Sequence, residues 1–217
     1  MAAFFFGKLM RNFVFILMLS FLGTSISGAD TCTYDTYRWN TLTKNAGDYK
    51  RIQKPYSQLT EKEIDELTGC TVCLEDQVDI FIENIPPFKA CKHLATDVKT
   101  ALEESIFLGQ TITEVVGYRV GKTKGDIDQS GNRTQFSNHS FGSAIDINPQ
   151  FNGLYNNCID YNSSCLLIKG GAWDPSRAES LKADAHIVRI MKSIGFKWGG
   201  EIEGKQKDFM HFSLSGY

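Results

Sequence analysis

Residues 137–147 read Ser-Asn-His-Ser-Phe-Gly-Ser-Ala-Ile-Asp-Ile, and this stretch decides the fold. If its last four residues form a strand, the side chain of Asp146 lies on the opposite face from the two isoleucines beside it, which point into a core. Gly142 lets the backbone turn sharply before that strand. The turn can return the carboxylate of Asp146 toward the imidazole of His139. The stretch therefore predicts a turn, a short strand and a His–Asp pair.

A second histidine motif, Asp-Phe-Met-His, lies near the C-terminus at residues 208–211. Two imidazoles and a carboxylate, here His139, Asp146 and His211, are the ligand set of a catalytic zinc site that leaves a fourth position open. Asp208 precedes the second histidine by three residues, close enough to act on a zinc-bound water without being a ligand. The spacing alone leaves a second interpretation open, in which His139 and Asp146 make only a structural hydrogen bond.

Around these motifs, helical and strand patterns alternate in a way typical of an α+β fold in one domain. Apolar residues recur at helical spacing over residues 90–107. Asp174-Pro175 offers a cap and a first-turn proline for another helix, which Gly195 ends. We predict a small antiparallel sheet with flanking helices. The predicted strands are residues 78–82, 112–119, 144–147, 196–198 and 208–214, and the predicted irregular segments are residues 30–60, 121–136 and 148–172.

The first 29 residues have the features of a secretory signal peptide. An apolar core over residues 13–22 follows the only two charges of the segment, Lys8 and Arg11, and small residues stand at 27–29. An uncleaved membrane anchor is the alternative, although the apolar run is short for a membrane span. Cleavage would leave 188 residues and lower the net charge from −2 to −4. We therefore expect a secreted or periplasmic monomer that has left the membrane.

All six cysteines follow this leader, and an even number in an exported chain indicates up to three disulfides. Cys158 and Cys165 enclose a short polar loop and are predicted to pair. The C-x-x-C spacing of residues 70–73 would suit a redox or zinc pair in a cytosolic protein, but behind a leader structural disulfides to Cys32 and Cys91 are favoured. The candidates for these disulfides are Cys32, Cys70, Cys73, Cys91, Cys158 and Cys165.

The balance of charges excludes a nucleic acid as an expected partner. The chain carries 23 Lys and Arg residues against 25 Asp and Glu residues, with no basic block. A protein that binds nucleic acid presents a basic patch or stripe. The composition, with 42% hydrophobic and 22% charged residues, is that of an ordinary globular protein.

The two histidine motifs resemble those of the zinc D-Ala-D-Ala peptidases of the VanX/VanY type, which have the Hedgehog/DD-peptidase fold. Residues 137–146 match the first metal motif, and residues 208–211 match the second motif, an acidic residue three before a histidine. Trp-Gly-Gly-Glu at residues 198–201 and Gly-Tyr-Arg at residues 117–119 match two further segments. The four pieces keep the order and spacing of the family, so the resemblance covers residues 112–214.

The resemblance implies one Zn²⁺ and a role for each residue of the motifs. Asp208 would be the general base, Arg119 would stabilise the oxyanion, and Ser137 would support the ligands from behind. The implied zinc ligands are His139, Asp146 and His211. The chain would then consist of the leader (1–29), an N-terminal segment with disulfides (30–88) and a zinc peptidase domain (89–217).

The implied activity is hydrolysis of peptidoglycan stem peptides, by an L-Ala-D-Glu endopeptidase or a D-Ala-D-Ala carboxypeptidase. Asp208 stands where VanX/VanY enzymes carry Glu, and the relatives with Asp resemble the L-alanyl-D-glutamate peptidase branch, which favours a bond inside the stem peptide. Arg119 lacks the usual small polar continuation, and Arg133 lies nearer to His139 in the sequence. A non-catalytic zinc-containing binding protein is the alternative, because Hedgehog signalling domains share this scaffold.

Overall fold

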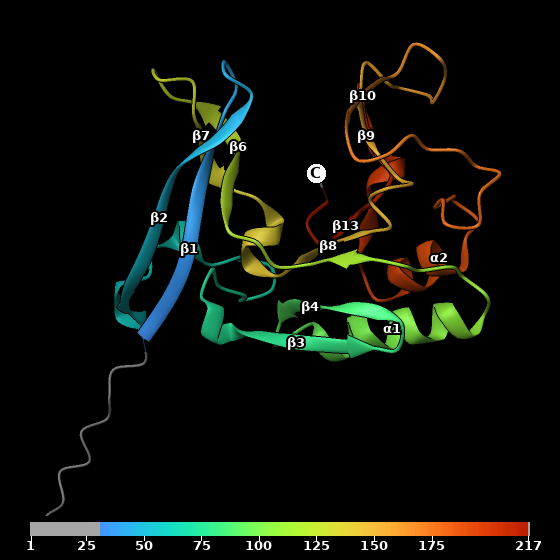
Figure 1. Cartoon of the computed structure of the whole chain (residues 1–217). Helices are drawn as coiled ribbons and strands as arrows, with labels where there is room; N and C mark the ends of the chain where they lie inside the picture. The colour runs from blue at the N-terminus through green and yellow to red at the C-terminus, as the bar shows by residue number, and fades with distance from the viewer. Residues whose placement is uncertain (1–30, 217) are drawn as a thin grey trace, which may run out of the picture.

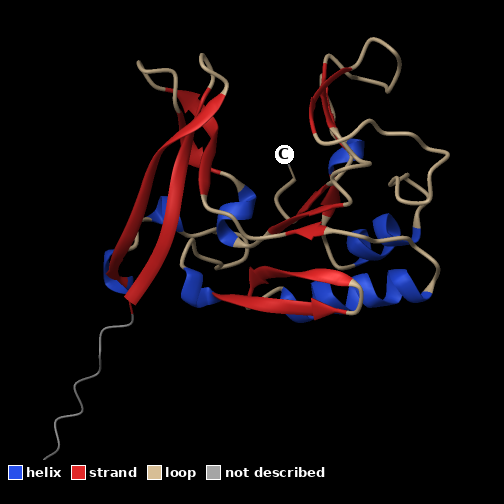
Figure 2. Cartoon of the chain, viewed as in Figure 1, coloured by secondary structure: helices blue, strands red, loops and turns tan. Residues whose placement is uncertain are grey.

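Strands outnumber helices in this protein, and two α-helices lie on one side of it (Figures 1 and 2). A computed structural model describes residues 31–216. The signal peptide predicted for residues 1–29 lies outside the described residues. The architecture is α+β in a single domain, as the sequence predicts.

The helices are α1 (Ala95–Phe107) and α2 (His186–Ser193). The strands are β1 (Thr31–Asn40), β2 (Asn45–Pro55), β3 (Gln77–Ile82), β4 (Ile85–Cys91), β5 (Val115–Val116), β6 (Gly121–Ile127), β7 (Arg133–Phe136), β8 (Ala144–Ile147), β9 (Leu154–Asn156), β10 (Leu166–Lys169), β11 (Lys197–Trp198), β12 (Gln206–Asp208) and β13 (His211–Ser213). No helix within residues 31–216 combines the length and the apolar composition needed to cross a membrane.

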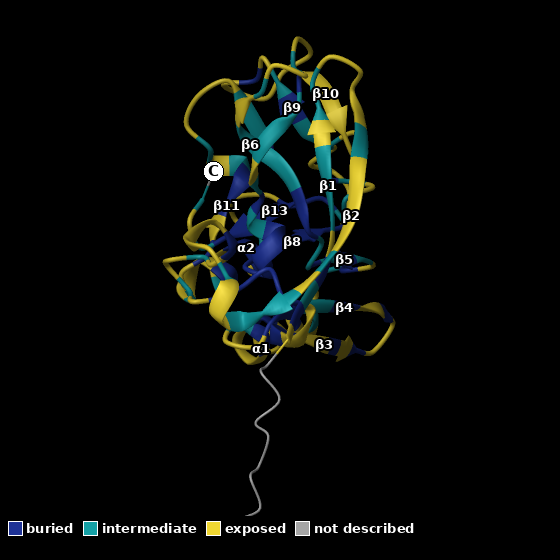
Figure 3. Ribbon diagram, turned by 90° about the vertical axis from the view of Figure 1, so that its left-hand side faces the viewer, coloured by how far each residue is buried: buried dark blue, intermediate teal, exposed yellow. Residues whose placement is uncertain are grey.

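The centre of the molecule is a four-stranded sheet of order β11-β13-β8-β5, in which every neighbouring pair is antiparallel. Ile145 and Ile147 of β8 are buried in the main apolar core, as their alternation with Asp146 predicts. Helices α1 and α2 each contribute their apolar face to the same core. Figure 3 shows β8 as buried, whereas β2 ranges from intermediate to exposed.

A second four-stranded sheet, of order β2-β1-β6-β7, stands on the other side of the molecule (Figure 1). Strands β1 and β2 form a long antiparallel hairpin, and β1 also pairs in parallel with β6 through Tyr37 and Arg38. The prediction of an irregular segment over residues 30–60 is therefore wrong. Cys32 and Tyr34 alternate with more exposed residues and are buried in a second apolar cluster, and Thr and Tyr favour strands.

Four other predictions differ from the structure. Residues 121–136 are a hairpin, because their Gly, Asp and Asn residues make the tight turn between β6 and β7. The predicted strand over residues 112–119 is reduced to β5, and the segment over residues 148–172 contains β9 and β10. Asp174 does not start a helix. Its carboxylate accepts a hydrogen bond from the backbone of Ser176 at 2.9 Å, which makes a local turn, and α2 begins only at His186.

Three disulfides join all six cysteines, and no described cysteine is free. Cys158 is bonded to Cys165, as predicted. Cys70 and Cys73 bond to Cys91 and Cys32, the two partners that the sequence predicts, and the pairs are Cys32–Cys73 and Cys70–Cys91. The two cysteines of the C-x-x-C spacing therefore bond to different partners, as structural disulfides do, and not to one another.

Candidate metal centre

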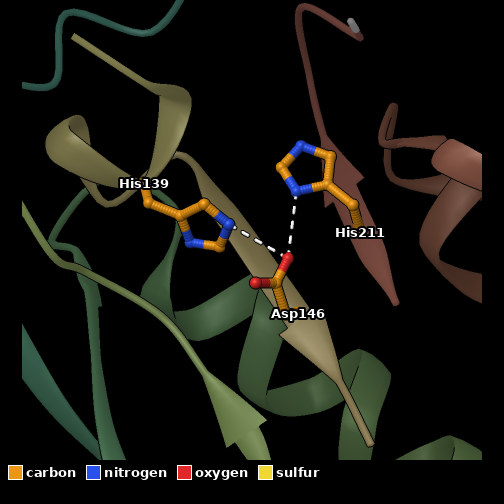
Figure 4. A group of neighbouring side chains, drawn as sticks. All are labelled: His139, Asp146 and His211. Atoms are coloured by element: carbon orange, nitrogen blue, oxygen red, sulfur yellow. Dashed lines mark hydrogen bonds and ion pairs between the residues drawn. The ribbon is translucent and has the colours of Figure 1, made fainter. Parts of the chain in front are cut away.

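The central sheet brings two of the predicted ligands together by register. His211 of β13 lies directly opposite Asp146 of β8, and opposed residues of antiparallel strands project from the same face. His139 lies in a 3₁₀ turn, Asn138–Phe141, just before β8. Gly142 ends this turn with a φ of 65°, a left-handed conformation that suits glycine. The three side chains point toward one another (Figure 4).

The distances within this group are short. Nε2 of His139 lies 3.0 Å from Oδ1 of Asp146, and Nδ1 of His211 lies 3.1 Å from the same oxygen. One potential ligand atom from each of the three residues lies within 4.8 Å of the others, and all three residues are buried. The group could therefore hold a metal ion.

The hydrogen bond on the far side of His139 shows that the donor set fits a metal. Its Nδ1 lies 2.9 Å from the carbonyl oxygen of Gly117, which can only accept, so Nδ1 carries the proton of that bond. In a neutral ring Nε2 then turns a lone pair toward the carboxylate of Asp146, so this contact can hold either a proton or a metal ion between the two groups. A carbonyl that fixes the outer nitrogen of a histidine is the usual support of a zinc ligand.

The protonation states of the group also suit a metal. Burial alone would raise the pKa of Asp146, but the charges and hydrogen bonds of His139 and His211 hold that pKa well below its usual range. Burial lowers the pKa of His211, although the nearby Asp146 carboxylate opposes this. Asp146 is therefore ionised at neutral pH, and burial favours the neutral form of His211; these are the forms that bind metal.

Strand β4 supports the His139 turn from behind through two glycines. A Cβ atom on Gly117 would lie 2.0 Å from the carbonyl oxygen of Lys89, and one on Gly142 would lie 2.5 Å from the amide nitrogen of Cys91. The amide of Cys91 donates a hydrogen bond to the carbonyl oxygen of Gly142 at 3.0 Å. No larger residue fits at either glycine without moving this backbone, so the close packing of β4 sets the position of His139.

Arg119 lies against a predicted ligand. Its Nη2 donates to Oδ2 of Asp146 at 2.6 Å, and its backbone amide donates to the carbonyl oxygen of His139 at 3.1 Å. Arg119 also lies at one border of a groove of about 560 Å³ along β1 and β2. Its role at the oxyanion stays a prediction. The guanidinium of Arg133 donates to the carbonyl oxygen of Gly125 at 2.6 Å, within the hairpin of β6 and β7.

Asp208, the predicted base, is buried at the end of β12, and β13 begins three residues later. The Trp-Gly-Gly-Glu segment explains its placement. A Cβ atom on Gly199 would lie 2.2 Å from the carbonyl oxygen of Asp208, and Nε1 of Trp198 donates to the carbonyl oxygen of Phe209 at 2.8 Å. The carboxylate of Asp208 is also one of the charges that act on the pKa of His211. Its role as base stays a prediction.

Ser137 is buried at the start of the His139 turn. Its carbonyl oxygen accepts a hydrogen bond from the amide of Ser140 at 2.9 Å, and its own amide donates to the carbonyl oxygen of Gly121. Ser137 therefore holds the turn in place. The motifs did not single out Lys124 and Lys169, which lie close enough to Asp208 for its charge to act on their pKa values. The position of Lys169 near Asp208 becomes apparent only from the pairing of β9 with β10 and with β12.

The comparisons with known proteins concern the same part of the chain. No curated protein and no solved structure matches the chain. The family model of D-alanyl-D-alanine carboxypeptidase matches residues 130–214. This range contains both histidine motifs and Asp208, but neither Arg119 nor the N-terminal hairpin. Over residues 130–214, the chain is therefore similar to the D-alanyl-D-alanine carboxypeptidases.

Proposed function

We propose that this protein is an exported zinc metallopeptidase that hydrolyses peptide bonds in peptidoglycan stem peptides. One observation carries the proposal: His139, Asp146 and His211 converge within 4.8 Å, inside the residues that match a peptidase family. The three disulfides support export, because disulfides persist in oxidising compartments. The protein would act as a monomer, in the periplasm or outside the cell.

In the proposed mechanism each polar residue of the site has one task. His139, Asp146 and His211 hold the zinc, which when bound supplies a Lewis acid and lowers the pKa of a water from about 15.7 toward 7. Asp208 accepts the proton of the attacking water and passes it to the leaving amine. Arg119 places a permanent positive charge beside the site, where it stabilises the negative charge that develops on the carbonyl oxygen.

The chemistry suits two bonds of the stem peptide, D-Ala-D-Ala and L-Ala-D-Glu. The matched family supports the first bond. The aspartate at position 208, where VanX/VanY enzymes carry glutamate, favours the second. We propose cleavage at L-Ala-D-Glu, with D-Ala-D-Ala as the alternative bond.

The test combines metal analysis with mass spectrometry of defined stem peptides after incubation. We expect about one zinc per purified chain, since a tight site keeps its metal. Release of L-Ala-capped fragments would identify the endopeptidase, and loss of the terminal D-Ala would identify the carboxypeptidase. His211→Ala should lose both zinc and activity. His186→Ala, at an exposed histidine of α2, is the matched control and should keep both.

Two outcomes would contradict the proposal. A content of less than about 0.2 zinc per purified chain would contradict the proposed zinc site, and the proposed function would fail with it. Intact peptides in both assays, with zinc bound, would instead support the non-catalytic binding protein.

A further inference from the structure

Lys169 lies on the same face of a sheet as the proposed base. In the sheet of order β10-β9-β12, Leu154 of β9 pairs with Lys169 on one side and with Asp208 on the other. Opposed residues of antiparallel strands project from the same face. Two strand spacings put the Cα atoms of Lys169 and Asp208 about 10 Å apart. The flexible four-carbon stem of Lys169 can bring its ammonium to the site across this distance.

The backbone around Lys169 is held closely. A Cβ atom on Gly153 would lie 3.0 Å from the carbonyl oxygen of Lys169 and 2.5 Å from that of Gly171. The amide of Gly171 donates to the carbonyl oxygen of Pro149 at 2.8 Å. The end of β10 is therefore packed against neighbouring backbone, which fixes the point from which the lysine extends.

Lys124 approaches the same site from the other side. It lies on β6, and its Nζ donates to Oδ1 of Asn138, the residue before His139, at 3.2 Å. Figure 1 shows β6 and β10 on opposite sides of β8 and β13, the strands that carry Asp146 and His211. Two lysines from opposite sides therefore flank the candidate metal centre.

The electrostatics agree with this placement. Desolvation lowers the pKa of each lysine, and the charge of Asp208 acts in the opposite direction on both. The charge of Arg119 lowers the pKa of Lys169 further. Three cationic side chains thus surround two carboxylates, Asp146 and Asp208, and a bound divalent metal would add to the positive excess. A local positive field in a chain of net charge −2 favours an anionic ligand.

We propose that Lys124 and Lys169 form a carboxylate-binding subsite beside the metal centre, which selects substrates whose leaving residue carries a free α-carboxylate. The proposal rests on the proposed function and narrows its substrate class. Ammonium groups make strong, charge-assisted hydrogen bonds to carboxylates. Both candidate bonds fit, because D-Ala and D-Glu can each present a carboxylate on the carbon that bears the new amine.

The test measures binding without turnover, on the zinc-loaded mature protein. The probes are ketomethylene analogues of L-Ala-D-Glu and of D-Ala-D-Ala, in which the scissile amide is replaced, each with a free α-carboxylate or an α-carboxamide. By calorimetry we expect at least one carboxylate analogue to bind about tenfold more tightly than its carboxamide, a difference of about 1.4 kcal/mol. The ratio of the two dissociation constants reports on the subsite alone.

Variants of the two lysines test whether these side chains cause the preference for the carboxylate analogue. Lys169→Gln and Lys124→Gln should each bring the ratio of the two dissociation constants toward one, and Lys169→Arg should restore part of it. Lys99→Gln is the matched control, because Lys99 lies on α1 and pairs with Glu103 at 3.7 Å, and it should keep the wild-type ratio. If Lys124→Gln fails to fold, Lys169→Gln still tests the subsite, since Lys169 is the more exposed of the two lysines.

Equal binding of carboxylate and carboxamide by the wild-type protein, or an unchanged ratio in Lys169→Gln, would overturn the subsite. If the protein cleaves stem peptides but shows equal binding, the subsite fails and the proposed function stands. If it prefers the carboxylate analogue but cleaves no peptide, the subsite stands and the proposed function fails.

Discussion

Different interactions stabilise the two sides of the molecule. Around β8 and β13, a large apolar core with fully buried residues such as Phe212 and Met191 supports the sheet. Around β1, the buried cluster is small, and half of its eight members are cysteines. A partly buried ion pair, Lys54 with Glu63 at 2.6 Å, adds to it. The first side depends on the hydrophobic effect, and the second depends on covalent bonds and charges.

The two sides therefore have different roles. The side around β8 and β13 carries the candidate catalytic residues, and the side around β1, which we call the disulfide side, supports the turn of His139. The candidate ligands and the candidate base project from the side of the molecule around β8 and β13, which we call the apolar side. There the pairing of the strands fixes their positions. The turn that carries His139, however, packs against β4 near Cys91, at the border of the disulfide side. Substitutions at the metal centre should therefore change activity, whereas reduction or acid should act first on the disulfide side.

The largest expected effect is a loss of turnover when Asp208 is replaced. Asp208→Asn keeps the shape of the side chain but cannot accept a proton, so turnover should fall by about 10² to 10⁴, the usual range for a lost general base. Zinc content should stay near the wild-type level. Metal analysis and peptide hydrolysis on the same sample check both statements.

The outcomes at Asp208 are distinct. If Asp208→Asn lost its zinc, the residue would be a ligand and Asp146 would need another role. Full activity would mean that the base lies elsewhere, with Glu201 as the next candidate, although Glu201 pairs with Lys192 at 2.7 Å.

The next largest effects are changes in stability and in zinc affinity when either of two disulfides on the N-terminal side is removed. Replacing Cys70 and Cys91 with serine should cost about 3 kcal/mol of unfolding free energy in the loop-entropy model. It should also weaken zinc binding about tenfold or more, as loss of support behind a ligand does. Replacing Cys32 and Cys73 should cost about 4 kcal/mol but leave zinc affinity unchanged.

Urea unfolding and competition with a chelator measure these two quantities separately. Equal zinc affinity in both disulfide variants would show that β4 holds the His139 turn without help from Cys91. A weakened affinity in the Cys32 and Cys73 variant alone would reverse the comparison.

The smallest expected effect is a pH dependence at Glu63. Burial raises the pKa of this carboxyl, but hydrogen bonds from Lys54, Tyr34 and Thr60 outweigh burial and lower the pKa from 4.5 to about 2. The stabilisation is therefore fully present above pH 4.5 and is lost as the pH falls toward 2. Glu63→Gln should lower the free energy of unfolding by roughly 2 kcal/mol at pH 7 and by little near pH 2.

Urea unfolding at several pH values checks this dependence. Glu61→Gln, at an exposed residue of the same 3₁₀ turn, should change stability by less than about 0.5 kcal/mol. If Glu63→Gln lowered the free energy of unfolding equally at pH 7 and at pH 2, the contribution of Glu63 would come from its packing and not from its charge.

The sequence predicted the part of the site that is local. Asp146 and His139 belong to one turn and one strand, and the alternation of β8 already places its isoleucines in the core. The position of His211 opposite Asp146 could be inferred only from the resemblance, because spacing does not reveal which strands pair. For Lys169 no signal existed, since its relation to Asp208 depends on the register of three strands.

The N-terminal hairpin was missed for a related reason. The alternation of Cys32 and Tyr34 with exposed residues is visible in the sequence, but polar residues dominate β1 and β2 and hide it. Parallel pairing of β1 with β6 joins distant segments, and such pairing leaves no local pattern. Asp174-Pro175 failed as a helix signal because the same residues also start an isolated turn.

The close packing of Gly117 and Gly142 against β4 implies an order of maturation. The His139 turn has no fixed position until β4 is in place, and β4 is tied to the N-terminal side by the bond between Cys70 and Cys91. Oxidative folding should therefore precede metal loading. A chain kept in a reducing compartment should hold the His139 turn less firmly and bind zinc more weakly, so we expect the metal centre to load mainly after the disulfides have formed.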